Sequence, residues 1–138
     1  WCVSNLCRGS APPTLRDLEF LIQCISLLMK HGIGFKEKNG GIFHNISDTL
    51  KDRITANINE ILTNSAWATS YLTQFEYDDV NYKDGSNYCI GRLGDEGVFK
   101  YCVHLMDSKV QNIRLPCNRV IGNLLAGTDQ VTRNCIDL

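Results

Sequence analysis

The sequence predicts an all-α fold, or one nearly so, built as a small disulfide-stapled bundle of about four to six helices. Three observations predict it: apolar residues recur at helical spacing, glycine and proline mark the ends of periodic stretches, and seven cysteines are spread from Cys2 to Cys135. The length of 138 residues and the 43% content of hydrophobic residues are typical of one globular domain. We therefore expect a single secreted helical domain over residues 1–138.

The first helix is expected to begin after Thr14, which can cap it together with Asp17 three residues later. Its apolar stripe consists of Leu15, Leu18, Ile22, Ile25 and Met29. Gly32 is expected to end this helix. Residues 32–44 contain four glycines and no apolar period, so they are predicted to form a mobile surface loop.

A second helix is expected to begin at Ser47 or Asp48. Its apolar stripe consists of Leu50, Ile54, Ile58, Ile61 and Leu62. The pattern either continues through Phe75 or breaks at Asn64-Ser65, because both of these side chains compete for backbone hydrogen bonds.

Two interpretations remain for the stretch after residue 88. A third helix would begin near Asp95 and carry apolar residues from Phe99 to Ile113. The alternative is a short β-hairpin near 88–104, turning around Gly94–Gly97. Pro116 is expected to start a further short helix that Gly127 ends, followed by a last turn from Thr128 to Cys135. No internal repeat is evident.

The cysteines are expected to form disulfide bonds, because they are numerous, dispersed and without the spacing of a zinc site. Six of the seven are predicted to pair, from the set Cys2, Cys7, Cys24, Cys89, Cys102, Cys117 and Cys135. Spacing favours the local pairs Cys89 with Cys102 and Cys117 with Cys135, although the connectivity stays open. The odd cysteine would allow a disulfide-linked dimer.

Two further features suggest secretion. The chain begins at Trp1 rather than Met, as after removal of a signal peptide, and Asn45-Ile46-Ser47 is an acceptor for N-glycosylation. With the cysteines, they predict a secreted, extracellular glycoprotein with glycan at Asn45.

Several functional classes are not expected. A net charge of −1 gives no basic excess for contacts with nucleic acid, and charged residues interrupt the apolar stretch Leu15–Met29, so no membrane span is predicted. No motif for a metal or a cofactor occurs, so neither is predicted. His31, His44 and His104 fall in different predicted elements. No catalytic residue is therefore assigned, and the chain is expected not to be an enzyme.

The segment 76–88 is the most unusual part of the sequence, with three tyrosines and four carboxylates. Tyrosine is enriched where proteins contact other proteins. We predict a noncatalytic binding or effector protein that contacts an extracellular protein through this segment. The predicted contact residues are Tyr77, Asp78, Asp79, Tyr82, Asp84 and Tyr88.

An alternative function is the extracellular transport of a small apolar ligand. Cross-linked helical domains can enclose an apolar pocket between helix faces. The candidate wall residues are Phe20, Met29, Trp67, Phe75, Phe99 and Met106.

Overall fold

The computed structural model describes residues 1–9, 11–42, 46–75, 87–127 and 132–133. Over these ranges it contains helices and no β-strand, which confirms the all-α prediction. The helices are α1 (Cys2–Cys7), α2 (Leu15–Ile42), α3 (Asp48–Leu72), α4 (Tyr88–Asp95), α5 (Val98–Leu105) and α6 (Gln111–Leu125).

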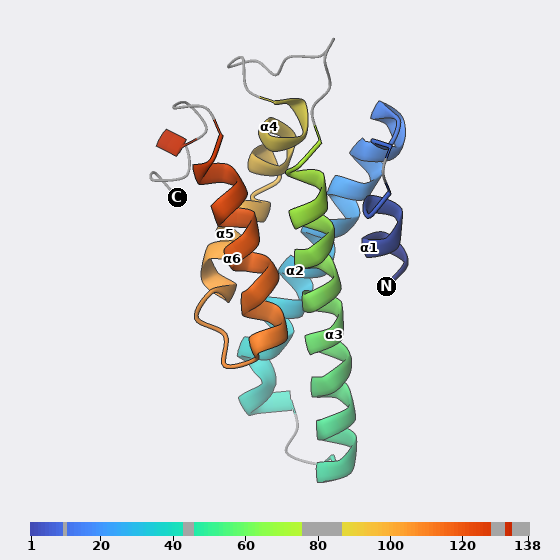
Figure 1. The fold of residues 1–138 in the computed structure, drawn as a ribbon. Coiled ribbons are helices and arrows are strands. Elements are labelled where there is room, and N and C mark those ends of the chain that lie inside the picture. The colour runs from blue at the N-terminus through green and yellow to red at the C-terminus, as the bar shows by residue number, and fades with distance from the viewer. Residues whose placement is uncertain (10, 43–45, 76–86, 128–131, 134–138) are drawn as a thin grey trace.

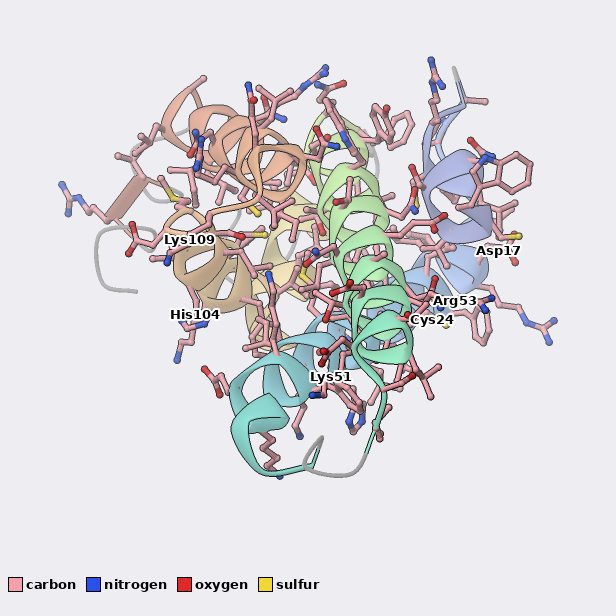
Figure 2. All side chains as sticks on the ribbon, turned by 90° about the horizontal axis from the view of Figure 1, so that it is seen from below. Asp17, Cys24, Lys51, Arg53, His104 and Lys109 are labelled. Atoms are coloured by element: carbon pink, nitrogen blue, oxygen red, sulfur yellow. The ribbon has the colours of Figure 1, made fainter. Side chains whose placement is uncertain are left out.

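The helices form two layers (Figure 1). In the front layer α3 packs between α1 and α6, and in the second layer α2, α4 and α5 lie behind them. Figure 2, seen from below, shows polar side chains such as Asp17, His104 and Lys109 at the outside of this double layer. One layer therefore presents three neighbouring helices on a common face.

The start of α2 forms as the sequence predicts. Thr14 Oγ1 accepts a hydrogen bond from the Asp17 backbone N–H at 3.3 Å and donates one to Asp17 Oδ2 at 2.7 Å. These bonds satisfy groups that the first turn of a helix leaves without partners. The predicted stripe fills the core, because four of its members are fully buried, namely Leu18, Ile22, Ile25 and Met29.

The predicted loop at 32–44 is wrong, because α2 continues without interruption to Ile42. Gly32 is buried and faces α3, where a Cβ atom added to it would lie 2.8 Å from Leu62 Cδ2. The glycine therefore permits close packing of α2 against α3. This packing outweighs the helix propensity that each glycine loses, about 1 kcal/mol relative to alanine.

Substitutions at two glycines in α2 test this explanation. Gly34 has no neighbouring atom within 4 Å of an added Cβ, so Gly34→Ala is expected to raise the free energy of unfolding by about 0.5–1 kcal/mol. Gly32→Ala must displace buried Leu62 and is expected to be less stable than Gly34→Ala by at least about 1 kcal/mol. Urea unfolding of the two variants measures the difference, and equal stabilities would contradict the close approach.

Helix α3 runs unbroken through Asn64-Ser65, so the continuous interpretation is confirmed. The Asn64 side chain donates to the Glu60 backbone carbonyl at 2.9 Å without interrupting the helix. The predicted stripe is only partly correct, because Ile58 and Leu62 are buried whereas Leu50 and Ile61 are exposed. In the second half of α3 most of the buried residues are small, namely Ser65, Ala66, Ala68, Thr69 and Ser70.

Of the two predictions for residues 88–113, the hairpin is wrong and the helix is partly correct, because Phe99, Cys102 and Val103 lie on a helix that ends at Leu105 instead of continuing to Ile113. The region holds two eight-residue helices, α4 and α5, separated at Gly97, whose φ of 70° lies in the left-handed region that glycine tolerates. Helix α6 then begins at Gln111, so Pro116 lies inside it rather than at its start. The glycines at Gly94–Gly97 do mark a turn, but this turn connects two helices rather than two strands.

The stretch Leu15–Lys38 in α2 is long and apolar enough to cross a membrane by length and composition alone, with a mean hydropathy of 1.3. Of this stretch, 44% is buried inside the protein. Six of its apolar residues fill the core, namely Leu18, Leu21, Ile22, Ile25, Met29 and Ile33, whereas Leu15, Phe20, Leu27 and Phe35 are exposed.

Candidate functional site

The three helices of the front layer share a pattern of side chains. Each carries a large or charged residue and, four positions later, an amide or a phenol: Trp1 and Asn5 on α1 and its N-cap, Trp67 and Tyr71 on α3, Arg119 and Asn123 on α6. Residues four apart lie on one face of a helix. We call these six residues the front-face ladder.

On α3 and α6 the ladder residues contact one another. The rings of Trp67 and Tyr71 stack with centroids 5.8 Å apart and an angle of 24° between their planes. The Arg119 Cζ atom lies 5.7 Å from the centroid of the Trp67 ring, within the range of a cation–π contact. With its amide oxygen facing the guanidinium, Gln74 accepts from Arg119 Nη2 at 2.7 Å and from Nε at 3.3 Å. The guanidinium is thus held in place over the indole.

Asn123 connects α6 to the end of α3. Its Nδ2 donates to the Ser70 carbonyl at 3.2 Å and to Thr73 Oγ1 at 2.9 Å. Thr73 Oγ1 in turn donates to the same carbonyl at 3.0 Å. Since both amide protons have partners within the protein, the side-chain oxygen of Asn123 is the group left to accept from a bound molecule.

On α1 the ladder residues face solvent. Trp1 is 77% exposed, and Asn5 is exposed as well. Ser4, three positions after Trp1, is buried, as is Ser70, three positions after Trp67. The two helices therefore present their tryptophans in the same rotational register.

This pattern is an internal repeat that the sequence analysis missed. The chain reads Trp-x-x-Ser-Asn-Leu from residue 1, Trp-x-x-Ser-Tyr-Leu from residue 67 and Arg-x-x-Gly-Asn-Leu from residue 119. The signal is short, and the intervals between copies are unequal because α2 and α3 are much longer than α5 and α6. Aligning the helix ends, rather than searching for a fixed period, would have found it.

Comparison with known proteins gives a consistent relationship. The chain is similar to importin alpha subunits. It is 26% identical over 137 residues to importin subunit alpha-1b of Oryza sativa subsp. japonica and 24% identical to importin subunit alpha-3 of Arabidopsis thaliana, with 99% of this chain covered in each case. The chain spans only 19% of the length of these curated relatives. No protein-family model matches the chain.

These relatives overturn the predicted function and location. They are importin subunits, so the predictions of a secreted glycoprotein effector, an extracellular protein partner and an extracellular ligand carrier are wrong. None of the relatives' names denotes an enzyme. The sequon at Asn45 lies outside the described residues.

The predicted disulfide stapling is also wrong for the part of the chain that the structure describes, where no two cysteines are joined. Cys7, Cys89, Cys102 and Cys117 instead fill the core as small apolar side chains. Burial raises the pKa of the Cys7 thiol to about 12. A hydrogen bond with Cys117, together with burial, raises the pKa of Cys102. Cys135 lies outside the described residues.

Alkylation without reductant tests the thiols. In the native chain, Cys2 and Cys24 are expected to react first, because they are more accessible than buried Cys7, Cys102 and Cys117. In denaturant all five are expected to react. Mass mapping of the alkylated peptides measures this, and disulfide-linked peptides containing any of the five would contradict it.

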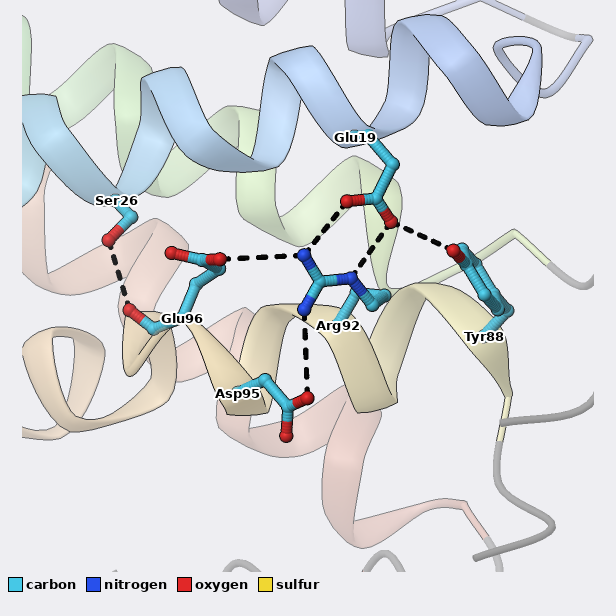
Figure 3. A network of polar contacts seen from close by, with 6 residues as sticks. All are labelled: Glu19, Ser26, Tyr88, Arg92, Asp95 and Glu96. Atoms are coloured by element: carbon cyan, nitrogen blue, oxygen red, sulfur yellow. Dashed lines mark hydrogen bonds and ion pairs between the residues drawn. The ribbon is translucent and has the colours of Figure 1, made fainter. Parts of the chain in front are cut away.

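Of the predicted partner-contact residues, only Tyr88 falls in the described part of the chain. Tyr77, Asp78, Asp79, Tyr82 and Asp84 lie outside it, so their role stays a prediction. Tyr88 donates from its hydroxyl to Glu19 Oε1 at 2.9 Å, next to Arg92 (Figure 3). Arg92 donates to both oxygens of Glu19 at 2.8 Å and lies 3.6 Å from Asp95 and 3.4 Å from Glu96. This network connects α2 to α4 and to Glu96, which caps the end of α4.

The Glu19 carboxylate is stabilised in its charged form. The hydrogen bonds from Arg92 lower its pKa, with a further contribution from Tyr88, against the opposing effect of burial. A depressed pKa stabilises the fold above the pKa of the unfolded chain, near 4.3, and this stabilisation is lost as the pH falls through the folded value.

Glu19→Gln is therefore expected to lower the free energy of unfolding by about 1–2 kcal/mol at pH 7, and by progressively less below about pH 4. Chemical unfolding across pH measures the difference from the wild type. Glu60→Gln is the control, because Glu60 is exposed and its side chain forms no bond among the described residues. A Glu19→Gln penalty that grows toward low pH would contradict the network's role.

The predicted pocket residues do not gather around one cavity. Met29 and Phe99 are buried in the core, Phe20 is exposed, and Trp67 packs at the front face. An open apolar groove of about 280 Å³ does lie between α2 and α3. It is lined by Leu27, Leu28, His31, Gly32, Phe35, Ile58 and Ile61.

The described histidines also lie apart. His31 lines the groove on α2, and His104 on α5 lies 3.5 Å from Glu37 at an exposed position. His44 is outside the described residues. The front-face ladder, which the sequence analysis did not assign, is thus the best-organised candidate site.

Proposed function

We propose that this chain is a polypeptide-binding segment of an adaptor of the importin alpha kind, which links a cargo protein to another importin subunit. The front face of α1, α3 and α6 holds an extended stretch of the cargo. The single observation that carries the proposal is the front-face ladder, repeated on three neighbouring helices.

The architecture supports this proposal. Residues 88–127 form a unit of three helices and about 40 residues, the size of an armadillo or HEAT repeat. Stacked repeats of this size build elongated surfaces on which other proteins bind. Helices α2 and α3 form a longer version of the last two helices of such a unit, and one core of buried residues supports a single folding unit over residues 1–138.

The chemistry of the ladder also suits an extended polypeptide. Such a segment presents backbone N–H and C=O groups at regular intervals, and an asparagine side chain offers both a donor and an acceptor. Among the described residues the Asn5 side chain has no hydrogen-bond partner, so its donor and its acceptor are both available, whereas Asn123 keeps only its acceptor oxygen. The rings of Trp1, Trp67 and Tyr71 provide surfaces for the side chains between the hydrogen bonds.

A peptide array tests the proposal. Three helices packed about 9 Å apart are crossed by roughly six extended residues, so immobilised peptides of about 12 residues are long enough. The labelled chain is expected to bind a subset of unstructured peptides of mixed composition, and Asn5→Ala is expected to weaken that binding. Gln23→Ala, which truncates an exposed amide on α2, is the control. An absence of peptide binding, or binding that is equal in the Asn5→Ala variant, would contradict the proposal.

A further inference from the structure

Two cysteine side chains meet in the core between α5 and α6. Cys102 lies on α5 and Cys117 on α6, and neither has any exposed surface. Their thiols contact each other through a hydrogen bond, and the two helices that carry them pack together. Neither residue belongs to the front-face ladder, so the contact is independent of the proposed function.

The two thiols differ in acidity. The hydrogen bond with Cys102 lowers the pKa of Cys117, against the opposing effect of burial, whereas the same bond and burial raise the pKa of Cys102. Cys7 on α1 is equally buried, but there burial alone raises the pKa, to about 12. Peroxides react with thiolates rather than with thiols. Cys117 is therefore the nucleophile of the pair, and Cys102 lies next to the product of its oxidation.

We propose that Cys102 and Cys117 are an oxidative modification site, which hydrogen peroxide converts to a reversible disulfide between α5 and α6. The Cys117 thiolate attacks one oxygen of the peroxide, so that an S–O bond forms, the O–O bond breaks and the leaving hydroxide takes up the proton that Cys117 released. The Cys102 sulfur then attacks the sulfenic sulfur, so that an S–S bond forms, the S–O bond breaks and hydroxide leaves with the Cys102 proton as water. The two thiols lose two electrons, and the peroxide is reduced to two water molecules.

This bond differs from the permanent cross-links expected from the sequence, which are Cys89 with Cys102 and Cys117 with Cys135. Without an oxidant both members of the pair stay thiols, as the structure has them. Access for the peroxide depends on α5, which has eight residues and follows the left-handed turn at Gly97. Short elements open locally at a lower cost than the whole fold, so a molecule as small as hydrogen peroxide reaches the thiols without global unfolding.

Peptide mapping after peroxide treatment of the reduced chain tests the proposal. Trypsin releases the two thiols in separate peptides, 101–109 and 115–119, unless they are bonded. Treatment continues until the exposed Cys2 is oxidised, and free thiols are then alkylated in denaturant. We expect the two peptides to be linked and dithiothreitol to separate them. Two unlinked peptides, or a bond from either thiol to a different cysteine, would overturn the proposal.

Two variants assign the roles within the pair. Cys117→Ala removes the nucleophile and is expected to slow the oxidation of Cys102 at least about tenfold. Cys7→Ala is the matched control, because it removes an equally buried thiol from α1, and it is expected to leave the rate of bond formation within about twofold. Unchanged oxidation of Cys102 in the first variant, or an equal loss of the bond in the second, would contradict the assignment. If Cys117→Ala does not fold by circular dichroism, the peptide map of the unsubstituted chain decides.

Discussion

Replacing Leu62 with alanine is expected to lower the free energy of unfolding by about 3 kcal/mol, within the usual range for a buried leucine. Leu62 has no exposed surface and lies against Gly32, where α2 and α3 pack closely. The truncation leaves a cavity that neither helix can fill without shifting. Equilibrium unfolding in urea measures the loss.

Ile61→Ala is the matched control for this prediction, since Ile61 is the neighbouring residue on α3 and is 40% exposed. It is expected to cost no more than about 1 kcal/mol. Similar losses in the two variants would show that the α2–α3 contact does not hold the core as described.

Replacing Trp67 with alanine is expected to weaken polypeptide binding at least about thirtyfold, a loss typical of a tryptophan at the centre of an interface. The change removes the surface that stacks on Tyr71 and supports the Arg119 guanidinium. Arg119 then loses its fixed position as well. Anisotropy titration of the tightest peptide measures the loss.

Phe20→Ala is the control, because it truncates an aromatic side chain that is 68% exposed on α2, a helix of the second layer. It is expected to leave the affinity within about twofold. Binding that depends on Phe20 but not on Trp67 would move the site away from the front face.

The helical class and the beginning of α2 could be predicted from the sequence because both depend on local signals. The cap at Thr14 and the stripe from Leu18 to Met29 lie within one continuous helix. The end of α2 could not be predicted in this way. Gly32 looks like a helix stop by propensity, and only its contact with Leu62, thirty residues later, explains why the helix continues.

The C-terminal half was mispredicted for a related reason. Helices α4 and α5 have eight residues each, too few for a helical period to be distinguished from a turn-rich stretch. Pro116 indicated a helix start by its general preference, yet tertiary packing buries it inside α6. Short elements such as these are defined by the helices against which they pack.

The cysteines misled the prediction of compartment, and with it that of function. Their number and spread suggested cross-links, but Cys7, Cys102 and Cys117 are buried thiols that pack as apolar residues. Helices α1 and α6, which contain Cys7 and Cys117, also carry the repeated motif that indicates a binding face, in Trp1 with Asn5 and in Arg119 with Asn123.

Chemical-shift mapping tests the central claim most directly. When the tightest peptide is titrated into isotope-labelled chain, we expect the largest amide shifts to cluster at Asn5, Trp67, Tyr71, Arg119 and Asn123, on the three helices of the front layer. Shifts that cluster instead around Phe35 and Ile61, in the groove between α2 and α3, would contradict it.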